Sequence, residues 1–294
     1  MAEPARICAI TGANGYIGSR IAAHLRREGW IVYELRHDLK SAVARDGLLL
    51  PYSLEEGVKP EVLRGVRALV HCAYDFRPTR WEEILAVNVK GSLRLLAAAR
   101  EAGVKRSIFF SSMSAFEGCQ SLYGRGKMEV EKEALKMGAV VIRPGLVFGR
   151  NAGGTFGALY GLVSASKIVP LIGSGSQVQY LAHEEDLCRL IAKICAVESD
   201  HIDSPISAAA ERSVTLREIV KVVAEAQGQK KIVIPIPWRV VWLGLKITER
   251  LGLGIGLRSD SLIGLVNSNR NPDFGPLRRM GVPFREFNAQ TLTA

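Results

Sequence analysis

Three side chains in one short stretch are suited to moving a proton to or from a bound molecule. Tyr123 and Lys127 lie four positions apart in "SLYGRGKMEVEKEAL", and on a helix that spacing brings both side chains to the same face. A phenol with its ordinary pKa of about 10 is a poor proton shuttle at neutral pH, but an ammonium group beside it lowers that pKa. Ser112 ends the preceding apolar run "SIFFSS", where a hydroxyl would face the ligand crevice of an open sheet. The alternative for Ser112 is a serine that only shapes a turn at the end of a strand.

Three glycines near the N-terminus predict a turn that approaches a phosphate group. Gly12, Gly15 and Gly18 lie in "ICAITGANGYIGSRIAAHL", between an apolar run over 7–10 and a helical repeat of apolar residues that stops near Gly29. Because glycine has no Cβ atom, it allows a sharp turn and a close approach of the backbone to a ligand. The free N–H groups at the start of the following helix would then bind an anion. The alternative is a glycine-rich turn without a ligand, since the spacing is GxxGxxG rather than GxGxxG.

The second apolar run, "IVYEL", indicates which dinucleotide such a turn would bind. In a dinucleotide-binding unit, an acidic residue about 20 positions past the glycines binds the adenosine ribose, whereas an arginine accommodates a 2′-phosphate. Arg36 follows this run, His37 lies beside it, and Asp38 comes late for the ribose role. A guanidinium holds phosphate through paired, charge-assisted hydrogen bonds. We therefore expect NADP rather than NAD, the alternative being an arginine that faces solvent at a strand end.

Apolar runs alternate with helical segments along the first half of the chain. "RALVHCA", "SIFFSS" and "AVVIRPGLVF" are typical of further strands, and the stretch from Trp81 to Ala102 is typical of a helix that ends at Gly103. This alternation predicts an α/β fold of the Rossmann type, which is a doubly wound parallel sheet wrapped by helices.

After Arg150 glycines crowd the chain, which predicts a smaller C-terminal lobe that binds the substrate. We expect residues 1–150 to form the NAD(P)-binding Rossmann domain, with 178–207 returning to it. Residues 151–177 and 208–294 would form the substrate-binding lobe.

The composition restricts the class of protein. A chain of 294 residues with 48% hydrophobic content can bury a full core, and its net charge of +10 favours anionic ligands. Because the basic residues are scattered rather than clustered in a block, we expect no nucleic-acid partner. The five cysteines form no CxxC pair, so we expect neither a disulfide framework nor a metal site. The sequence shows no charged leader before an apolar region and no apolar stretch of about 18 residues, so we expect a cytoplasmic protein without a membrane span.

In this order, "TGANGYIGS", "SIFFSS" and "YGRGK" resemble the extended short-chain dehydrogenase/reductases, the branch of NAD(P)-dependent epimerases and dehydratases. The resemblance covers roughly the whole chain. "AVNVKGSLRLLAAAREAGVKRSIFFSS" places Asn88 at the family's usual asparagine, and "YLAHEEDLCRLI" places Asp186 at its aspartate.

The resemblance assigns a role to each chemical group. It implies that Tyr123 is the acid/base, that Lys127 lowers its pKa and holds the nicotinamide ribose, and that Ser112 hydrogen-bonds the reacting oxygen. Within "VVIRPGLVFG", Pro144 and Gly145 would lie beside the nicotinamide. Together, the motifs and the resemblance predict the cofactor-binding residues Gly12, Asn14, Gly15, Tyr16, Ile17, Gly18, Arg36, Ala73, Tyr123, Lys127 and Pro144.

These features predict an NADP-dependent oxidoreductase or epimerase that acts at a carbinol or ketone carbon, with a nucleotide sugar as the favoured small-molecule substrate. One alternative is a reductase of a small ketone or a lactone-like substrate. Another is a non-catalytic NADP-sensing or scaffold protein, although such a module would not need both Tyr123 and Lys127. The resemblance also allows a homodimer built on a helix pair of the first lobe.

Two further stretches have a second interpretation. "HEED" over 183–186 carries metal-binding side chains, but adjacent positions on a helix splay apart, so we expect this stretch to cap a helix. Trp238, Val241, Trp242 and Leu245 share one helical face. That face could contact a membrane or an apolar substrate, but we expect it to be buried against the other lobe.

Overall fold

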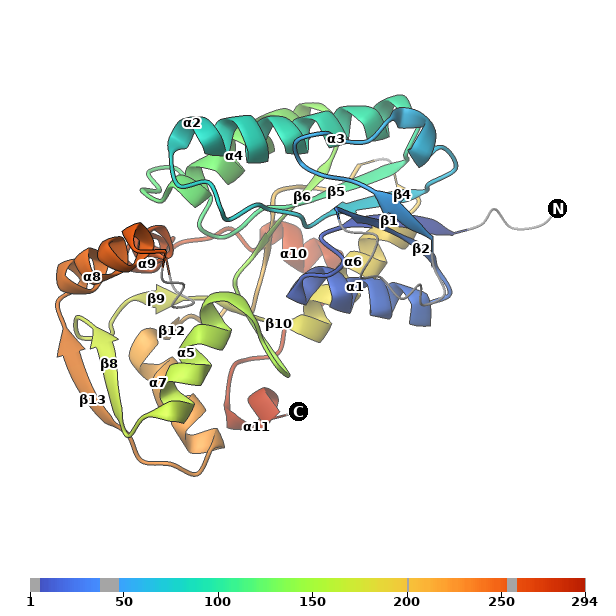
Figure 1. The fold of residues 1–294 in the computed structure, drawn as a ribbon. Coiled ribbons are helices and arrows are strands. Elements are labelled where there is room, and N and C mark those ends of the chain that lie inside the picture. The colour runs from blue at the N-terminus through green and yellow to red at the C-terminus, as the bar shows by residue number, and fades with distance from the viewer. Residues whose placement is uncertain (1–5, 38–47, 200, 253–257, 294) are drawn as a thin grey trace.

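The computed structural model describes residues 6–37, 48–199, 201–252 and 258–293 of the chain. Seven parallel strands form its central sheet in the order β11-β6-β5-β4-β1-β2-β3 (Figure 1). The strands are β1 Ile7–Thr11, β2 Ile31–Arg36, β3 Leu49–Pro51, β4 Ala68–His71, β5 Arg106–Phe110, β6 Val140–Pro144 and β11 Ile206–Ala208. The strand order reverses between β1 and β4, where a doubly wound sheet opens a crevice at the carboxyl ends of its strands. The predicted Rossmann-type fold is confirmed.

Helices cover both faces of this sheet (Figure 1). They are α1 Tyr16–Arg27, α2 Trp81–Ile84, α3 Lys90–Glu101, α4 Leu122–Lys136 and α6 Glu184–Ala196. Alternate residues of β1 enter different cores, because successive side chains of a strand point to opposite faces. Cys8 and Ile10 pack in the core with α1 and α6, whereas Ala9 packs in the core with α3 and α4. Strands buried on both faces need nearly continuous apolar runs, which explains why those runs were readable from the sequence.

The helix expected from Trp81 to Ala102 is present but is not uniform. Five residues, Leu85–Val89, form a π-helix between α2 and α3. A π-helix bonds each amide one residue further back than an α-helix does, and this shifts the directions in which the following side chains point. Asn88 lies within this segment and is buried.

The run "AVVIRPGLVF" forms two strands rather than the single strand expected. It breaks at Gly145 into β6 and β7 (Leu146–Phe148), and β7 pairs with β10 (Leu181–His183) instead of joining the central sheet. A Cβ atom at Gly145 would lie 2.2 Å from the backbone oxygen of Tyr180. The crossing chain therefore requires glycine at the point where the strand turns out of the sheet.

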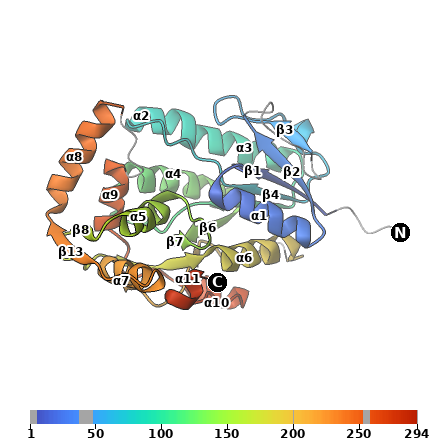
Figure 2. The ribbon, with the colours of Figure 1, turned by 60° about the horizontal axis from the view of Figure 1, so that its bottom comes forward.

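A second core lies below the sheet in Figure 1. Its elements are α5 Gly154–Ala165, β8 Ile168–Ile172, β9 Val178–Gln179, β12 Val214–Thr215, α7 Leu216–Ala226, β13 Ile232–Ile236 and α11 Ala289–Thr293. Phe148, Phe156, Val169 and Ile219 are among the side chains buried there. Two more helices, α8 (Trp238–Arg250) and α9 (Ser259–Val266), pack on each other; α8 lies at the edge of the molecule, and α9 lies between it and α4 (Figure 2).

The boundaries expected for the lobes differ from the structure at two places. Residues 178–207 were expected in the first domain, but β9 pairs with β12 of the second lobe. The segment 208–294 was assigned as a whole to the substrate-binding lobe, but α10 (Gly275–Met280) packs beside β11 of the central sheet. Phe274, Leu277 and Val282 share the core of α1 and α6. The sequence shows that these three side chains are apolar, but it does not indicate which of the two cores they join.

No helix in the described parts of the chain combines the length and the apolar character that crossing a bilayer requires.

Candidate active site

Two adjoining cavities open at the carboxyl ends of the central strands. The larger has a volume of about 570 Å³ and follows the turn after β1 and the end of β2; we call it the long cleft. The smaller has a volume of about 240 Å³ and is lined by residues of both lobes; we call it the inner cavity. The residues that line both are Tyr74, Phe76, Ser112, Tyr123, Pro144 and Gly145.

Every residue expected to bind the cofactor lines the long cleft. These residues are Gly12, Asn14, Gly15, Tyr16, Ile17, Gly18, Arg36, Ala73, Tyr123, Lys127 and Pro144. The three elements that supply most of them are the turn before α1, the end of β2 and the start of α4. Segments far apart in the sequence thus meet along one cleft.

The three glycines of the first turn serve different purposes. Gly12 has a φ of +68°, and a Cβ atom there would lie 2.9 Å from the amide nitrogen of Ala73. A Cβ atom at Gly18 would lie 2.2 Å from the backbone oxygen of Gly12, so α1 can start this close to the turn only with glycine. At Gly15, which precedes α1, a Cβ atom would meet only the Gly12 oxygen, at 3.2 Å. Gly15 therefore leaves space beside the N-terminus of α1, where an anion is favoured by the helix dipole and free N–H groups.

Arg36 ends β2 at the edge of the long cleft. Its guanidinium forms an ion pair with Glu34, whose carboxylate also binds Arg26 at 2.6 Å. The Nε atom of Arg36 is buried without a hydrogen-bond partner among the described residues. Asp38, two positions further, lies outside the described residues.

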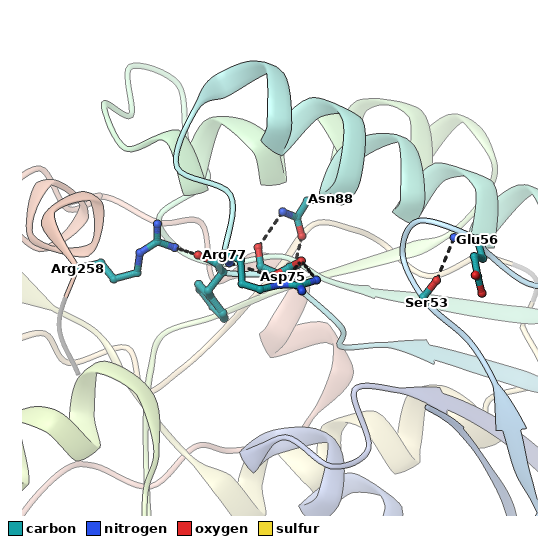
Figure 3. Close-up of polar contacts among 7 residues, drawn as sticks. Ser53, Glu56, Asp75, Arg77, Asn88 and Arg258 are labelled. Carbon is teal, nitrogen blue, oxygen red and sulfur yellow. Dashed lines mark hydrogen bonds and ion pairs between the residues drawn. The ribbon is translucent and has the colours of Figure 1, made fainter. Parts of the chain in front are cut away.

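Two hydroxyl groups of the long cleft are also buried without a hydrogen-bond partner in the described part of the chain: Tyr52 Oη and Ser111 Oγ. Buried polar groups are nearly always paired, so such groups indicate a site for a polar ligand. Beside Tyr52, Ser53 Oγ accepts the backbone N–H of Glu56 at 3.0 Å and shapes the loop after β3 (Figure 3). A cradle of glycines with a helix N-terminus, an arginine and unpaired hydroxyls fits a dinucleotide.

A buried network holds the end of β4 against the glycine turn. Thr11 Oγ1 accepts the amide of Ala73 at 3.2 Å and lies 2.7 Å from Nδ1 of His71, whose Nε2 lies 2.8 Å from Ser92 Oγ. Burial, and then the charge of Lys127, lowers the pKa of His71 to about 3, so this ring is neutral at physiological pH. The sequence pattern gave no indication of this network.

The three chemical residues come together where the two cavities meet. Ser112 follows β5, while Tyr123 and Lys127 extend from the first turns of α4. Lys127 is buried and its Nζ donates a hydrogen bond to the Phe110 backbone oxygen at 2.6 Å. The same Nζ lies 5.7 Å from the centre of the Tyr123 ring and 5.0 Å from that of Tyr74.

The pKa values of this group correct one expectation. Burial raises the pKa of Tyr123 to about 12, and its interaction with Ser112 only partly opposes that rise. Lys127 was expected to lower the phenol's pKa, but burial outweighs any such effect. Burial also lowers the pKa of Lys127 to about 8, since the charged ammonium is taken out of water. At neutral pH Tyr123 is therefore a protonated phenol, which can donate its proton to a carbonyl oxygen.

A carboxylate from the C-terminal lobe holds the start of the helix that carries Tyr123. Asp260, on α9, accepts the backbone N–H of Leu122 at 2.7 Å and that of Tyr123 at 2.9 Å. Ser121 caps the same helix by accepting the N–H of Gly124 at 3.1 Å. Asp260 lies 137 positions from Tyr123, and no local pattern could have indicated the contact.

Arg258 fixes the loop that faces Tyr123 across the inner cavity. It donates hydrogen bonds to the backbone oxygens of Phe76 and Pro78. Figure 3 shows Arg258 pointing toward the loop that carries Asp75 and Arg77. The Phe76 ring stacks on the Tyr123 ring at 5.9 Å, and the Tyr74 ring meets it edge-on at 4.9 Å. The phenol thus lies among aromatic rings.

Asn88 and Asp186 have positioning contacts. Asn88 accepts the N–H of Asp75 at 2.8 Å and donates to its backbone oxygen at 2.9 Å, which fixes the loop after β4 (Figure 3). Asp186 lines neither cavity. It is buried and forms ion pairs with Arg189 at 2.7 Å and Arg285 at 2.8 Å, which tie the C-terminal segment to α6.

The stretch "HEED" caps a helix, as expected. His183 precedes α6, and its Nδ1 accepts the backbone N–H of Glu185 at 3.2 Å. Glu184 accepts a hydrogen bond from the Tyr16 hydroxyl and pairs with Arg20 at 3.2 Å, so it joins α6 to α1. Among the described residues there is no cluster of three or more side chains that could hold a metal ion.

The helix that carries Trp238 differs from expectation. Leu245 is buried, but Trp238, Val241 and Trp242 are only partly covered, and the helix packs on α9 of its own lobe. This face is therefore covered in part by α9 rather than fully buried against the first lobe as expected.

Comparison with known proteins gives the class and then the family. The sheet order and the cleft are those of a dinucleotide-binding fold, and the similar proteins are NAD(P)-dependent oxidoreductases and epimerases. The chain is a member of the NAD dependent epimerase/dehydratase family, whose model matches residues 8–204.

Two curated relatives are similar to the chain over most of their length. A ceramide reductase from Caulobacter vibrioides is 28% identical over 255 residues, which are 81% of this chain and 76% of that protein. A UDP-glucose 4-epimerase from Vibrio cholerae is 26% identical over 261 residues, which are 78% of this chain and 78% of that protein.

Solved structures show the same fold. MoeE5, in complex with UDP-glucose and NAD, is 21% identical to this chain. The match covers 97% of this chain and 95% of the MoeE5 chain, with a TM-score of 0.72. The UDP-glucose 4-epimerase of Thermotoga maritima, in a structure with UDP-glucose, is 21% identical to this chain. The match covers 79% of this chain and 85% of the epimerase chain, with a TM-score of 0.66.

Proposed function

We propose that the protein is an NADP-dependent oxidoreductase that reduces a ketone to a carbinol, or the reverse. The observation that supports this most is that Ser112 and Tyr123 line both cavities. A dinucleotide in the long cleft and a substrate in the inner cavity would meet at these two side chains. A binding module would not need Tyr123 and Lys127 together at that place.

The chain's own residues would move the proton and hold the reacting groups. Tyr123, whose phenol stays protonated at neutral pH, donates its proton to the carbonyl oxygen. Ser112 donates a hydrogen bond to the same oxygen as negative charge develops there. Lys127, on α4, and Pro144 both line the long cleft and would hold the nicotinamide ribose and the nicotinamide ring, respectively. Bound NADPH supplies the hydride.

The preference for NADP over NAD rests on Arg36. Its Nε is buried beside the cleft and lacks a hydrogen-bond partner in the described residues, so a 2′-phosphate would satisfy it. The pairing with Glu34 would then be shared between the carboxylate and the phosphate.

The substrate we favour is an uncharged ketone. Among the described residues that line the inner cavity, Arg258 is the only cation, and it donates hydrogen bonds to the backbone oxygens of Phe76 and Pro78. The aromatic rings around Tyr123 suit an apolar group better than a diphosphate. The name of the ceramide reductase relative supports an uncharged substrate.

A nucleotide sugar is the second candidate. The net charge of +10 favours a diphosphate, and the UDP-glucose 4-epimerase relative acts on a substrate of this kind. In that case the reaction would be oxidoreduction or epimerisation at a carbinol carbon of the sugar.

Screening NADPH oxidation with aliphatic and aromatic ketones and with 4-keto nucleotide sugars tests the proposal. We expect turnover with ketones that exceeds turnover with nucleotide sugars. Turnover confined to nucleotide sugars would favour the second candidate, and no turnover with a broad panel of either class would contradict the oxidoreductase proposal.

A further inference from the structure

A third cavity lies in the C-terminal lobe, and we call it the apolar chamber. It has a volume of about 330 Å³ and lies among α5, β8, β13 and α8. Its lining residues are Leu146, Thr155, Ala158, Leu159, Leu162, Pro170, Leu171, Ile172, Leu216, Ile236, Val241 and Leu265. Thr155 is the one member of this lining with a polar side chain. Such a chamber can bind only an apolar group.

The apolar chamber adjoins the inner cavity. Leu146, Thr155 and Leu265 line both, so a molecule whose reacting carbon lies at Tyr123 can extend between these side chains into the chamber. The far end reaches the surface: Leu162 lines the chamber and is itself 38% exposed, and Pro170 beside it is exposed too. The two cavities thus form one path from the phenol to the outside of the C-terminal lobe.

We propose that the apolar chamber binds a hydrocarbon chain of the substrate, which makes the substrate an amphiphilic ketone or carbinol. This proposal rests on the proposed reductase function for the position of the reacting carbon. The chain would leave the reacting carbon past Leu146 and Leu265, and its end would lie near Leu162 on α5. Each methylene moved from water into such an apolar site tightens binding by roughly fourfold.

Binding of 2-hexanone and 2-decanone, measured by calorimetry in the presence of NADP⁺ so that no reduction occurs, tests this proposal. Because 2-decanone has four more methylenes, we expect its Kd to be lower by at least about 50-fold. Ala158→Phe, which fills the chamber, should reduce the ratio of the two Kd values to less than about fivefold. Ala165→Phe makes the same change at an exposed position of α5 outside the chamber and should leave the ratio unchanged.

Unchanged NADPH affinity in both variants serves as the control for folding, and Ala158→Leu adds less volume if Ala158→Phe does not fold. Equal Kd values for the two ketones in the wild type would overturn the proposal. If 2-decanone binds as expected but NADPH reduces neither ketone, the proposed function fails while the chamber stands. If both ketones are reduced with the same kcat/KM, the chamber proposal fails while the function stands.

A separate observation concerns the outside of the same lobe. Most of the large apolar side chains that the described residues expose lie on α5, β8, β13 and α8, and we call them the outer face: Tyr160, Leu162, Ile168, Ile232, Ile234, Val240, Leu243, Ile247 and Leu251. Val240, Leu243, Ile247 and Leu251 follow one another at helical spacing and are between 52% and 67% exposed. Figures 1 and 2 both place α8 at the edge of the molecule, away from the central sheet.

The charges around the outer face have one dominant sign. Over 154–172 and 229–251 the basic residues are Lys167, Lys230, Lys231, Arg239, Lys246 and Arg250, and the one acidic residue is Glu249. The Glu249 carboxylate accepts the N–H and the hydroxyl of Ser259, at 2.7 and 2.9 Å, and also lies 3.8 Å from the ammonium of Lys246. The other five basic residues have no acidic partner within these two ranges. Exposed apolar side chains interspersed with lysine and arginine are typical of a surface that rests on an anionic bilayer.

We infer that the outer face binds the surface of an anionic phospholipid membrane. Leu162 belongs both to this face and to the lining of the apolar chamber, so the chamber would open toward the bilayer. A chain-bearing substrate could then enter without crossing water. This inference stands on the exposed side chains and their charges, independently of the chamber.

Co-sedimentation with vesicles tests the membrane surface. We expect the protein to bind phosphatidylcholine vesicles that contain phosphatidylglycerol, and to bind pure phosphatidylcholine at least tenfold more weakly. The double change Leu243→Glu and Ile247→Glu should weaken binding to the anionic vesicles by at least tenfold. Leu135→Glu, at an exposed leucine near the end of α4, is the matched control and should not.

Light scattering distinguishes a membrane from a second copy of the chain. If the protein forms a dimer that the double change dissociates, and does not bind the anionic vesicles, the outer face is a dimer interface and the inference is wrong. Vesicle binding that the double change leaves intact would also overturn it.

Discussion

Replacing Asp260 with asparagine tests whether the C-terminal lobe positions the phenol. The Asp260 carboxylate accepts the N–H groups of Leu122 and Tyr123 at 2.7 and 2.9 Å, at the start of the helix that carries the proton donor. An asparagine keeps one acceptor oxygen and turns an NH₂ group toward the second N–H. The helix is expected to form still, because Ser121 caps it independently.

The size of the effect follows from the bond that is lost. A hydrogen bond to a charged group contributes about 1.5–3 kcal/mol. If that free energy maintains the position of Tyr123, Asp260→Asn lowers kcat by about tenfold to 150-fold, because 1.36 kcal/mol corresponds to a factor of ten. The Kd of NADPH should remain within about twofold, since Asp260 does not line the long cleft.

The assay is NADPH oxidation with a ketone found in the screen, together with a fluorescence titration of NADPH. Asp273→Asn is the matched control: the Asp273 carboxylate accepts the N–H of Gly275 at 2.7 Å, before a helix remote from Tyr123. An unchanged kcat in Asp260→Asn would refute the positioning role. An equal loss of kcat in both variants would mean that the effect reflects general destabilisation.

Four further changes test cofactor binding and the glycine turn. Arg36→Ala should raise the Kd of NADPH at least tenfold, about 1.4 kcal/mol, and leave that of NADH unchanged; equal effects on both would remove the basis for NADP. Because the pKa of Lys127 is lowered to about 8, its charge is present below pH 8 and lost above it, so NADPH affinity should fall as pH rises through about 8. Lys127→Met should bind NADPH weakly at all pH values, and an unchanged alkaline fall in this variant would assign it to another group. Gly15→Val should abolish NADPH binding with little loss of stability. Gly18→Ala should lower the unfolding temperature, since its Cβ atom would lie 2.2 Å from the Gly12 oxygen. Circular dichroism measures the loss of stability in each variant, and NADPH titration measures the loss of binding.

The parts of the molecule that the sequence predicted are those that local pattern controls. The first strand, its glycine turn and the helix from Tyr16 follow from apolar periodicity and from residues without a Cβ atom. The pair Tyr123 and Lys127 shares a helix face because of its spacing alone. Arg36 ends its strand as expected.

The parts that could not be predicted depend on contacts between distant segments. The strand breaks at Gly145 because the Tyr180 backbone crosses it, and Asp260 reaches Tyr123 from the far end of the chain. The pKa of Tyr123 is raised because surrounding residues bury it. The spacing of Tyr123 and Lys127 indicated only that a nearby ammonium would lower this pKa. The exposed apolar side chains of α8 could not be predicted either, because their exposure depends on which elements pack around the helix.

Tyr123→Phe tests the central claim most directly. The change removes only the phenolic oxygen, so NADPH should bind with a Kd within about twofold of the wild type while kcat falls by roughly 10²-fold to 10⁴-fold, the usual contribution of general acid–base catalysis. Turnover of the same ketone at the wild-type rate by Tyr123→Phe, with NADPH bound, would show that Tyr123 is not the proton donor.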